Sequence, residues 1–142
     1  MSGLSNFLRD NKKCKNSAKF VASKSFLDDE GNPIQWEIKA LSASQEEAIR
    51  ASCTKKVPTP GKKGVFVPET DYNLYVGKMA AMCTVFPNLN DAELQNSYGV
   101  MGADMLLKEM LLPGEYTAYI SKVQEVNGFD VSMDEIVEEA KN

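Results

Sequence analysis

The order of hydrophobic and polar positions near the start of the chain predicts a β-hairpin over residues 18–41. Within residues 19–27, and again within residues 34–41, apolar side chains recur at alternate positions. This period is typical of a strand with one buried face. The segment between them, DDEGNP at 28–33, is rich in turn-forming residues. A lone hairpin is marginally stable in water, so we expect a helix to cover its apolar face.

A helix predicted over residues 42–54 is the first candidate for that cover. Ser42 or Ser44 can cap its N-terminus, since a serine hydroxyl accepts hydrogen bonds from the first free N–H groups of a helix. Ser44 with Glu47 three residues later also matches the capping-box pattern.

The composition of residues 55–68 predicts an exposed, mobile and basic loop. Its first ten residues hold two Pro, two Gly and four Lys, and such clusters interrupt regular structure. The apolar triplet at 65–67 either adds a short third strand or docks the loop onto the body.

Helical periodicity dominates residues 70–141. The longest helix is predicted over residues 70–86, ended by Pro87. Its apolar positions follow steps of three and four: Tyr72, Tyr75, Val76, Met79, Met82, Cys83 and Phe86. Further helices are expected after an Asn90 cap, over residues 103–111, over residues 113–126 with Pro113 at the first helical position, and from Ser132.

These elements predict an α+β fold in a single domain, residues 1–142. An N-terminal β-hairpin packs against a mainly α-helical C-terminal two thirds of about four to five helices. No run of about 18 apolar residues occurs, and the polar N-terminal segment is unlike a signal peptide. We therefore expect a cytoplasmic protein without membrane contact.

The residue types present argue against an enzyme. Histidine is absent, which removes the commonest general base and metal ligand. The three cysteines are widely spaced without a C-x-x-C pair, so we expect free thiols rather than a metal site or a disulfide framework. No glycine-rich phosphate loop or carboxylate pair suited to acid–base chemistry is evident. The sequence predicts no catalytic residues, cofactor or metal, and the acidic turn at 28–32 lacks the spacing of a calcium loop.

Charge is unevenly distributed along the chain. Residues 1–66 hold 12 Lys/Arg against 7 Asp/Glu, a surplus of +5, whereas residues 67–142 hold 4 against 13, giving −9. Such polarity favours head-to-tail homo-oligomers or a partner of complementary charge. Alternatively, the two halves intermix in space and their fields partly cancel. Nucleic acid is not an expected partner, because the basic segment 55–63 has no aromatic residues and the whole chain is acidic.

Methionine and tyrosine supply the candidate partner-binding residues. Five of the seven methionines lie within residues 79–110. Methionine is flexible and polarizable, so a Met-rich groove can fit varied apolar helices, although the same residues could simply fill the core. Tyrosine is enriched at interfaces. The candidates are Tyr72, Tyr75, Met79, Met82, Met105 and Met110.

Several short motifs occur in a recognisable order. The first is the string FVASK-x-F-x-D-x-x-G-x-P-x-x-WEI-x-A at 20–40, followed by the serine-capped helix. Asp71-Tyr72 then opens the Met-rich helix, and later motifs are Phe86-Pro87-Asn88-Leu89 and the stretch from Leu106 to Pro113-Gly114-Glu115-Tyr116. Over residues 4–140 or so, the chain resembles the XkdN-like phage tail assembly chaperones.

This resemblance implies a function that the residues alone do not. Such chaperones are thought to bind the long helical tape measure protein, keep it soluble, recruit tail tube subunits and leave as the tube polymerises. The chain would then act in the host cytoplasm for a contractile-tailed phage or prophage and be absent from the mature tail. The family also implies a longer, frameshifted form, itself a candidate partner. The alternative is a structural virion component of the tail tube or neck.

Overall fold

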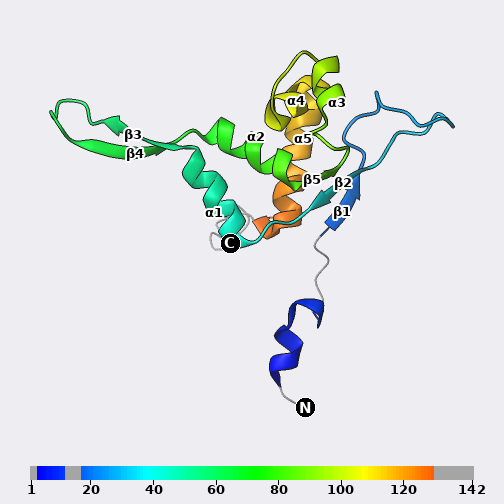
Figure 1. Cartoon of the computed structure of the whole chain (residues 1–142), viewed down its shortest axis with the longest axis horizontal. Coiled ribbons are helices and arrows are strands. Elements are labelled where there is room, and N and C mark those ends of the chain that lie inside the picture. The colour runs from blue at the N-terminus through cyan, green and yellow to red at the C-terminus, as the bar shows by residue number, and fades with distance from the viewer. Residues whose placement is uncertain (1–2, 12–16, 130–142) are drawn as a thin grey trace, which may run out of the picture.

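The computed structural model describes residues 3–11 and 17–129 of the protein (Figure 1). The predicted α+β fold is confirmed. The helices are α1 (Ala43–Ser52), α2 (Tyr72–Cys83), α3 (Ala92–Ser97), α4 (Ala103–Met110) and α5 (Pro113–Gln124), with short turns η1 (Gly3–Phe7), η2 (Arg9–Asn11) and η3 (Glu125–Phe129). The strands are β1 (Ser17–Phe20), β2 (Trp36–Lys39), β3 (Thr54–Pro58), β4 (Phe66–Thr70) and β5 (Thr84–Phe86). No helix within the described ranges has the length and apolar character needed to cross a membrane.

The first two strands form the predicted antiparallel hairpin, but they are shorter than expected. Phe20 pairs with Trp36, and the ladder then opens until a single bridge joins Leu27 to Pro33. Between these points Ser23 is buried, and its hydroxyl accepts a hydrogen bond from the Ser25 N–H. The buried polar side chain and its local hydrogen bond replace strand pairing over residues 21–25.

A third strand joins the sheet where the sequence predicted the end of a helix. Helix α2 stops at Cys83 rather than at residue 86, and β5 pairs antiparallel with β2 to give the order β1-β2-β5. Thr84 marks the change: its hydroxyl donates to the Ala80 carbonyl and lies 2.6 Å from the Tyr119 hydroxyl. Pairing with β2 therefore overrides a helical pattern that continues to Phe86.

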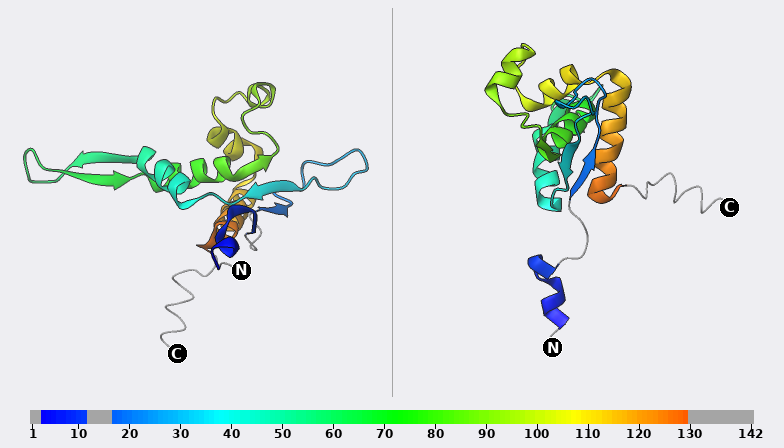
Figure 2. Two further views of the ribbon diagram at one scale, coloured as in Figure 1. Left: turned by 60° about the horizontal axis from the view of Figure 1, so that its bottom comes forward. Right: turned by 90° about the vertical axis from the view of Figure 1, so that its right-hand side faces the viewer.

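The prediction of an irregular loop over residues 55–68 is wrong, because β3 and β4 pair over their whole length. We call residues 54–70 the arm. Both strands are edges of a two-stranded sheet, so Pro58 and Pro68 can occupy positions that need no ladder donor. Gly61 and Gly64, with φ of 77° and 75°, form the turn at the tip. The arm projects from one side of the body and the β1–β2 connection from the other (Figures 1 and 2).

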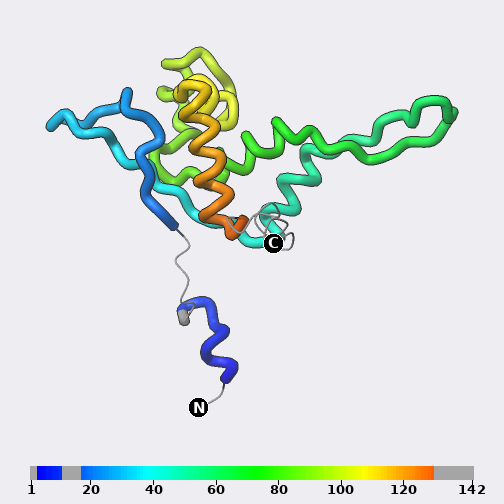
Figure 3. The backbone as a smooth tube through the Cα atoms, turned by 180° about the vertical axis from the view of Figure 1, so that it is seen from behind, coloured from blue at the N-terminus to red at the C-terminus, as the bar shows by residue number. Residues whose placement is uncertain are grey.

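The core lies where β2, α2, α4 and α5 meet, and α5 runs through the middle of the body (Figure 3). The rings of Trp36 and Tyr119 pack edge to face with centroids 5.3 Å apart. Cys53 and Cys83 are buried free thiols, as expected, while Cys14 lies outside the described residues. Burial raises the pKa of the Cys83 thiol.

Helix ends follow the sequence signals with small shifts. Ser42 caps α1 and forms a capping box with Gln45, so the Ser44–Glu47 alternative is not used. Asp91 rather than Asn90 caps α3, and Pro113 opens α5 as predicted. After α5, the side-chain oxygen of Asn127 accepts a hydrogen bond from the Leu41 N–H at 2.8 Å, tying η3 to the end of the sheet. The helix predicted from Ser132 lies outside the described residues.

Alkaline conditions are expected to destabilise the fold through Tyr119. Burial raises the pKa of this tyrosine to about 12, whereas an unfolded chain ionises its tyrosines near a pKa of about 10. The contribution of protonated Tyr119 to the free energy of unfolding is complete below the pKa of the tyrosine in the unfolded chain. It is lost as the pH rises through the pKa in the folded protein. Between these values the free energy of unfolding should fall by about 1.4 kcal/mol per pH unit from this group. Urea unfolding at pH 8 to 11, compared with Tyr119→Phe, measures the effect. An equal pH dependence in both proteins would contradict it.

Candidate partner-binding site

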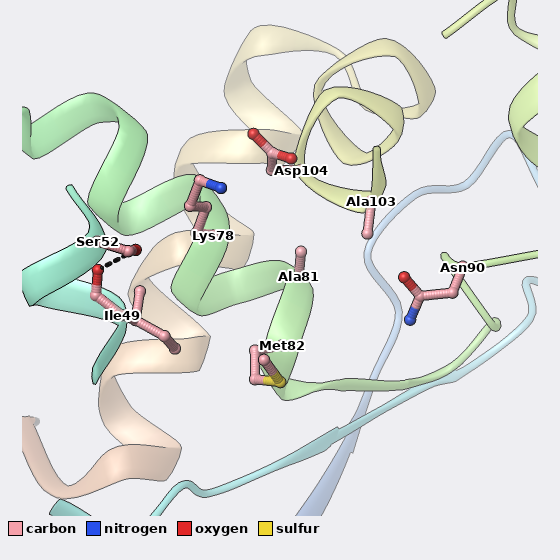
Figure 4. A pocket seen from close by; sticks show the side chains of 8 residues that line it. All are labelled: Ile49, Ser52, Lys78, Ala81, Met82, Asn90, Ala103 and Asp104. Atoms are coloured by element: carbon pink, nitrogen blue, oxygen red, sulfur yellow. Dashed lines mark hydrogen bonds between the residues drawn. The ribbon is translucent and has the colours of Figure 1, made fainter. Parts of the chain in front are cut away.

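Helices α1, α2 and α4 enclose an open groove of about 250 Å³ on the surface of the protein (Figure 4). We call it the α2 groove, because α2 contributes three of its lining residues. Its lining residues are Ile49, Ser52, Lys78, Ala81, Met82, Asn90, Ala103 and Asp104. The apolar members come from all three helices, whereas the polar members include Asn90, which lies on the connection between β5 and α3.

Two contacts fix the walls of the groove. The Tyr75 hydroxyl donates to Glu46 at 2.8 Å and so ties α2 to α1. Burial, and after it this hydrogen bond to a carboxylate, raises the pKa of Tyr75 to about 12. On the other side, Gly77 lets α4 and α5 approach closely: a Cβ at this position would lie 3.3 Å from the Tyr116 hydroxyl.

The apolar surface of the groove centres on α2. Met82 is 54% exposed and lies beside Ala81, with Ile49 on one side and Ala103 on the other. Lys78 and Asp104 bring opposite charges to the same rim (Figure 4). Small and flexible side chains flanked by a few polar groups are suited to hold the apolar face of a helix.

The six predicted site residues separate in space. Met82 lies in the α2 groove, and Met105 is exposed on α4 next to Asp104 in the chain. Met79 is only 3% exposed and belongs to the core, so it offers no surface to a partner. The rings of Tyr72 and Tyr75 lie 6.2 Å apart, but Tyr72 lines a hollow at the base of the arm.

Met110 lies in a separate hollow, which we call the sheet pocket. This pocket has a volume of about 200 Å³ and almost entirely apolar walls. It is formed by Phe26, Ile34, Trp36, Phe86, Pro87, Leu94, Tyr98 and Met110. The sequence pattern assigned Phe26 and Trp36 to the hairpin face and Phe86 to a helix, so their convergence was missed. The cis peptide bond before Pro87 accompanies the turn out of β5 into this wall.

Sequence analysis also missed the small residues of the α2 groove. Ala81 and Ala103 carry no distinctive signal, because alanine is common in any helix. Ile49, on the helix that was expected to cover the hairpin, is mostly buried and contributes to the groove. Only the packing of α1 and α4 on either side of α2 makes these residues neighbours.

Removing the Tyr116 hydroxyl is expected to stabilise the protein. This oxygen is buried and has no hydrogen-bond partner within residues 3–11 and 17–129. An unpaired buried hydroxyl carries a desolvation cost, so Tyr116→Phe should raise the free energy of unfolding by about 1 kcal/mol. Tyr119→Phe is the matched control, because it removes a hydroxyl that is paired with Thr84 and should lower stability by about 1 kcal/mol at pH 7. Chemical denaturation of both variants tests the contrast, and equal losses would contradict it.

Comparison with known proteins decides the family. Residues 4–141 match the model of the family described as "Phage XkdN-like tail assembly chaperone protein, TAC". The chain belongs to this family. The predicted family is therefore confirmed, and the protein is by family a phage tail assembly chaperone.

Individual relatives agree with this assignment. The chain is 32% identical over 123 residues to the uncharacterized protein YqbN of Bacillus subtilis strain 168, covering 84% of this chain and 80% of that protein. It is 28% identical over 127 residues to the phage-like element PBSX protein XkdN of the same strain, covering 87% and 83%. A crystal structure of YqbN superposes with a TM-score of 0.75 at 25% identity, over 91% of this chain and 98% of that one.

Family membership also gives the broad class of partner. Tail assembly chaperones act on tail proteins, and the XkdN relative belongs to a phage-like element, so a phage or prophage setting is supported. Among the described residues, the α2 groove and the sheet pocket are two hollows with apolar lining that are candidate contact sites for a tail protein.

Proposed function

We propose that this chaperone binds the tape measure protein of its phage or prophage and keeps it soluble during tail assembly. In this proposal it acts in the host cytoplasm, helps to recruit tail tube subunits and leaves before a contractile tail is complete. The tape measure protein of such a tail is a long, largely helical chain with apolar faces that must be shielded until the tube encloses it.

The α2 groove is the observation that carries the proposal. The apolar half of its lining, Ile49, Ala81, Met82 and Ala103, comes from α1, α2 and α4, and a hollow between helices can accept the apolar face of an amphipathic helix. Met82, more than half exposed, supplies an adaptable contact within this lining. Because methionine repacks easily around different side chains, one groove can serve many segments of a long helix.

The rim of the groove supports reversible binding. Lys78 and Asp104 can meet charges beside the apolar face of a bound helix without being buried deeply. Rim charges influence association rate and orientation more than affinity. A chaperone that must release its client as the tube grows is suited to such a shallow, open site.

Co-expression with the tape measure protein of the same phage or prophage tests the proposal. We expect the tape measure protein to precipitate alone and to elute with this chain as a soluble complex containing several copies of the chaperone. A tape measure protein that still precipitates, with this chain eluting alone, would contradict it.

Analysis of purified tails separates the proposal from the structural alternative. A chaperone that leaves during assembly is absent from finished tails, whereas a tail tube or neck component is retained. Mass spectrometry of tails purified from the phage should therefore detect tube subunits and the tape measure protein but not this chain.

A further inference from the structure

The arm has the surface of an element made for contact with another molecule. Every residue of β4 is exposed, and three residues of β3 are exposed as well. Within residues 3–11 and 17–129, β3 and β4 pair only with each other, so each strand has one edge with no strand partner there. A two-stranded ribbon buries too little apolar surface to be more than marginally stable alone, so this arm gains most from a partner.

The tip of the arm combines an apolar triplet with positive charge. Val65, Phe66 and Val67 are all exposed, and Phe66 is 57% exposed next to the turn. Residues 54–70 contain four lysines and one acidic residue, Glu69, which gives a net charge of +3. The other described residues carry 8 Lys/Arg against 14 Asp/Glu, a net charge of −6. The arm and the body of the same chain are thus oppositely charged.

The sheet pocket has the complementary chemistry. Its walls are apolar and aromatic, and its volume of about 200 Å³ suits a single large side chain. Exposed carboxylates precede two of its wall residues in the chain: Glu93 before Leu94, and Glu109 before Met110. An acidic cluster, residues 28–30, lies on the connection between the wall residues Phe26 and Ile34.

We propose that the arm of one copy docks into the sheet pocket of a second copy of this chain. Phe66 enters the pocket, and the lysines of the arm face the carboxylates around it. The arm and the sheet lie on opposite sides of the body (Figure 1), so an arm is directed away from its own pocket. Two different surfaces then meet at each junction, and such a heterologous contact repeats head to tail.

This inference does not depend on tape measure binding, because the sheet pocket and the α2 groove share no residue. If both hold, a row of chaperones joined by their arms would present a row of grooves to one long helix. Linked sites of this kind raise the apparent affinity for an extended partner without any new contact.

The first test is sedimentation of the purified full chain over a range of concentrations. We expect the average mass to rise with concentration at low salt and to fall at high salt, because added ions screen the attraction between arm and pocket. Phe66→Asp should weaken the association about tenfold or more, whereas Met101→Asp, at a 92% exposed position outside both sites, should not. A chain that remains monomeric at its highest soluble concentration, or associates equally after Phe66→Asp, would overturn the proposal.

Complementation between variants tests the pocket itself. Leu94→Arg places a long charged side chain in the pocket, and the double variant Glu93→Lys with Glu109→Lys reverses its charge at two exposed positions in case the first variant fails to fold. Each pocket variant should be monomeric alone, as should Phe66→Asp. A mixture should form a one-to-one pair, since an intact arm then meets an intact pocket. If the wild type associates but the mixture does not form pairs, the pocket is not the acceptor.

Discussion

Replacing Trp36 with alanine is expected to lower the free energy of unfolding by about 3–5 kcal/mol, which is a large part of the stability of a small domain. Trp36 is only 2% exposed and lies on the central strand of the sheet. Its ring packs against Tyr119 and lies with its centroid 6.4 Å from that of Phe26. The variant therefore loses apolar burial and two aromatic contacts, and it leaves a cavity between β2 and α5.

Denaturation followed by far-ultraviolet circular dichroism measures this effect, because Trp36 is the only tryptophan and its fluorescence is lost in the variant. Met101→Ala is the control, since an exposed side chain away from the core should change stability by less than about 0.5 kcal/mol. If Trp36→Ala costs no more than about 1 kcal/mol, the sheet is not the centre of the core.

A charged side chain placed in the α2 groove is expected to lower the affinity for the tape measure protein strongly. Met82→Asp puts a carboxylate among the apolar lining residues, and Ala81→Arg fills the groove with a long side chain. At a central contact such changes cost about 2 kcal/mol or more, which is roughly a thirtyfold loss of affinity. The affinity of purified chaperone for soluble tape measure segments measures the loss.

Met101→Asp is the matched control for Met82→Asp, because it makes the same change at an exposed methionine outside the groove. Thermal unfolding of all three variants confirms that the fold is retained. If the two groove variants keep the wild-type affinity while Leu94→Arg loses affinity, the tape measure protein binds at the sheet pocket and not in the α2 groove.

The predictable parts of the fold are those encoded by neighbouring residues. The turn at 28–33 and the start of α5 follow from local turn and capping chemistry, and both occur as expected. Strand β5 could not be found this way, because the helical spacing of α2 continues to Phe86 and only pairing with β2 selects the extended form. The arm was missed for a related reason: its prolines and glycines are typical of loops, and an isolated ribbon tolerates them.

The candidate site was predicted in part. Helical periodicity places Met79 and Met82 close together on α2, but it does not say which of the two faces the core. The structure buries Met79 and exposes Met82, because α4 and α5 cover one side of α2. Met110 was grouped with them by its proximity in the sequence, yet α4 directs it to the sheet pocket. The basic character of residues 55–68 was predicted from the sequence, but their extended form as a paired ribbon was not.

Oxidative footprinting of the chaperone with and without the tape measure protein tests the central claim most directly. Methionine oxidation follows exposure, so Met82 and Met101 should both react in the free chain. The account predicts that Met82 becomes protected in the complex while Met101 remains reactive. Equal oxidation of Met82 in the free and bound chaperone would contradict binding of the tape measure helix in the α2 groove.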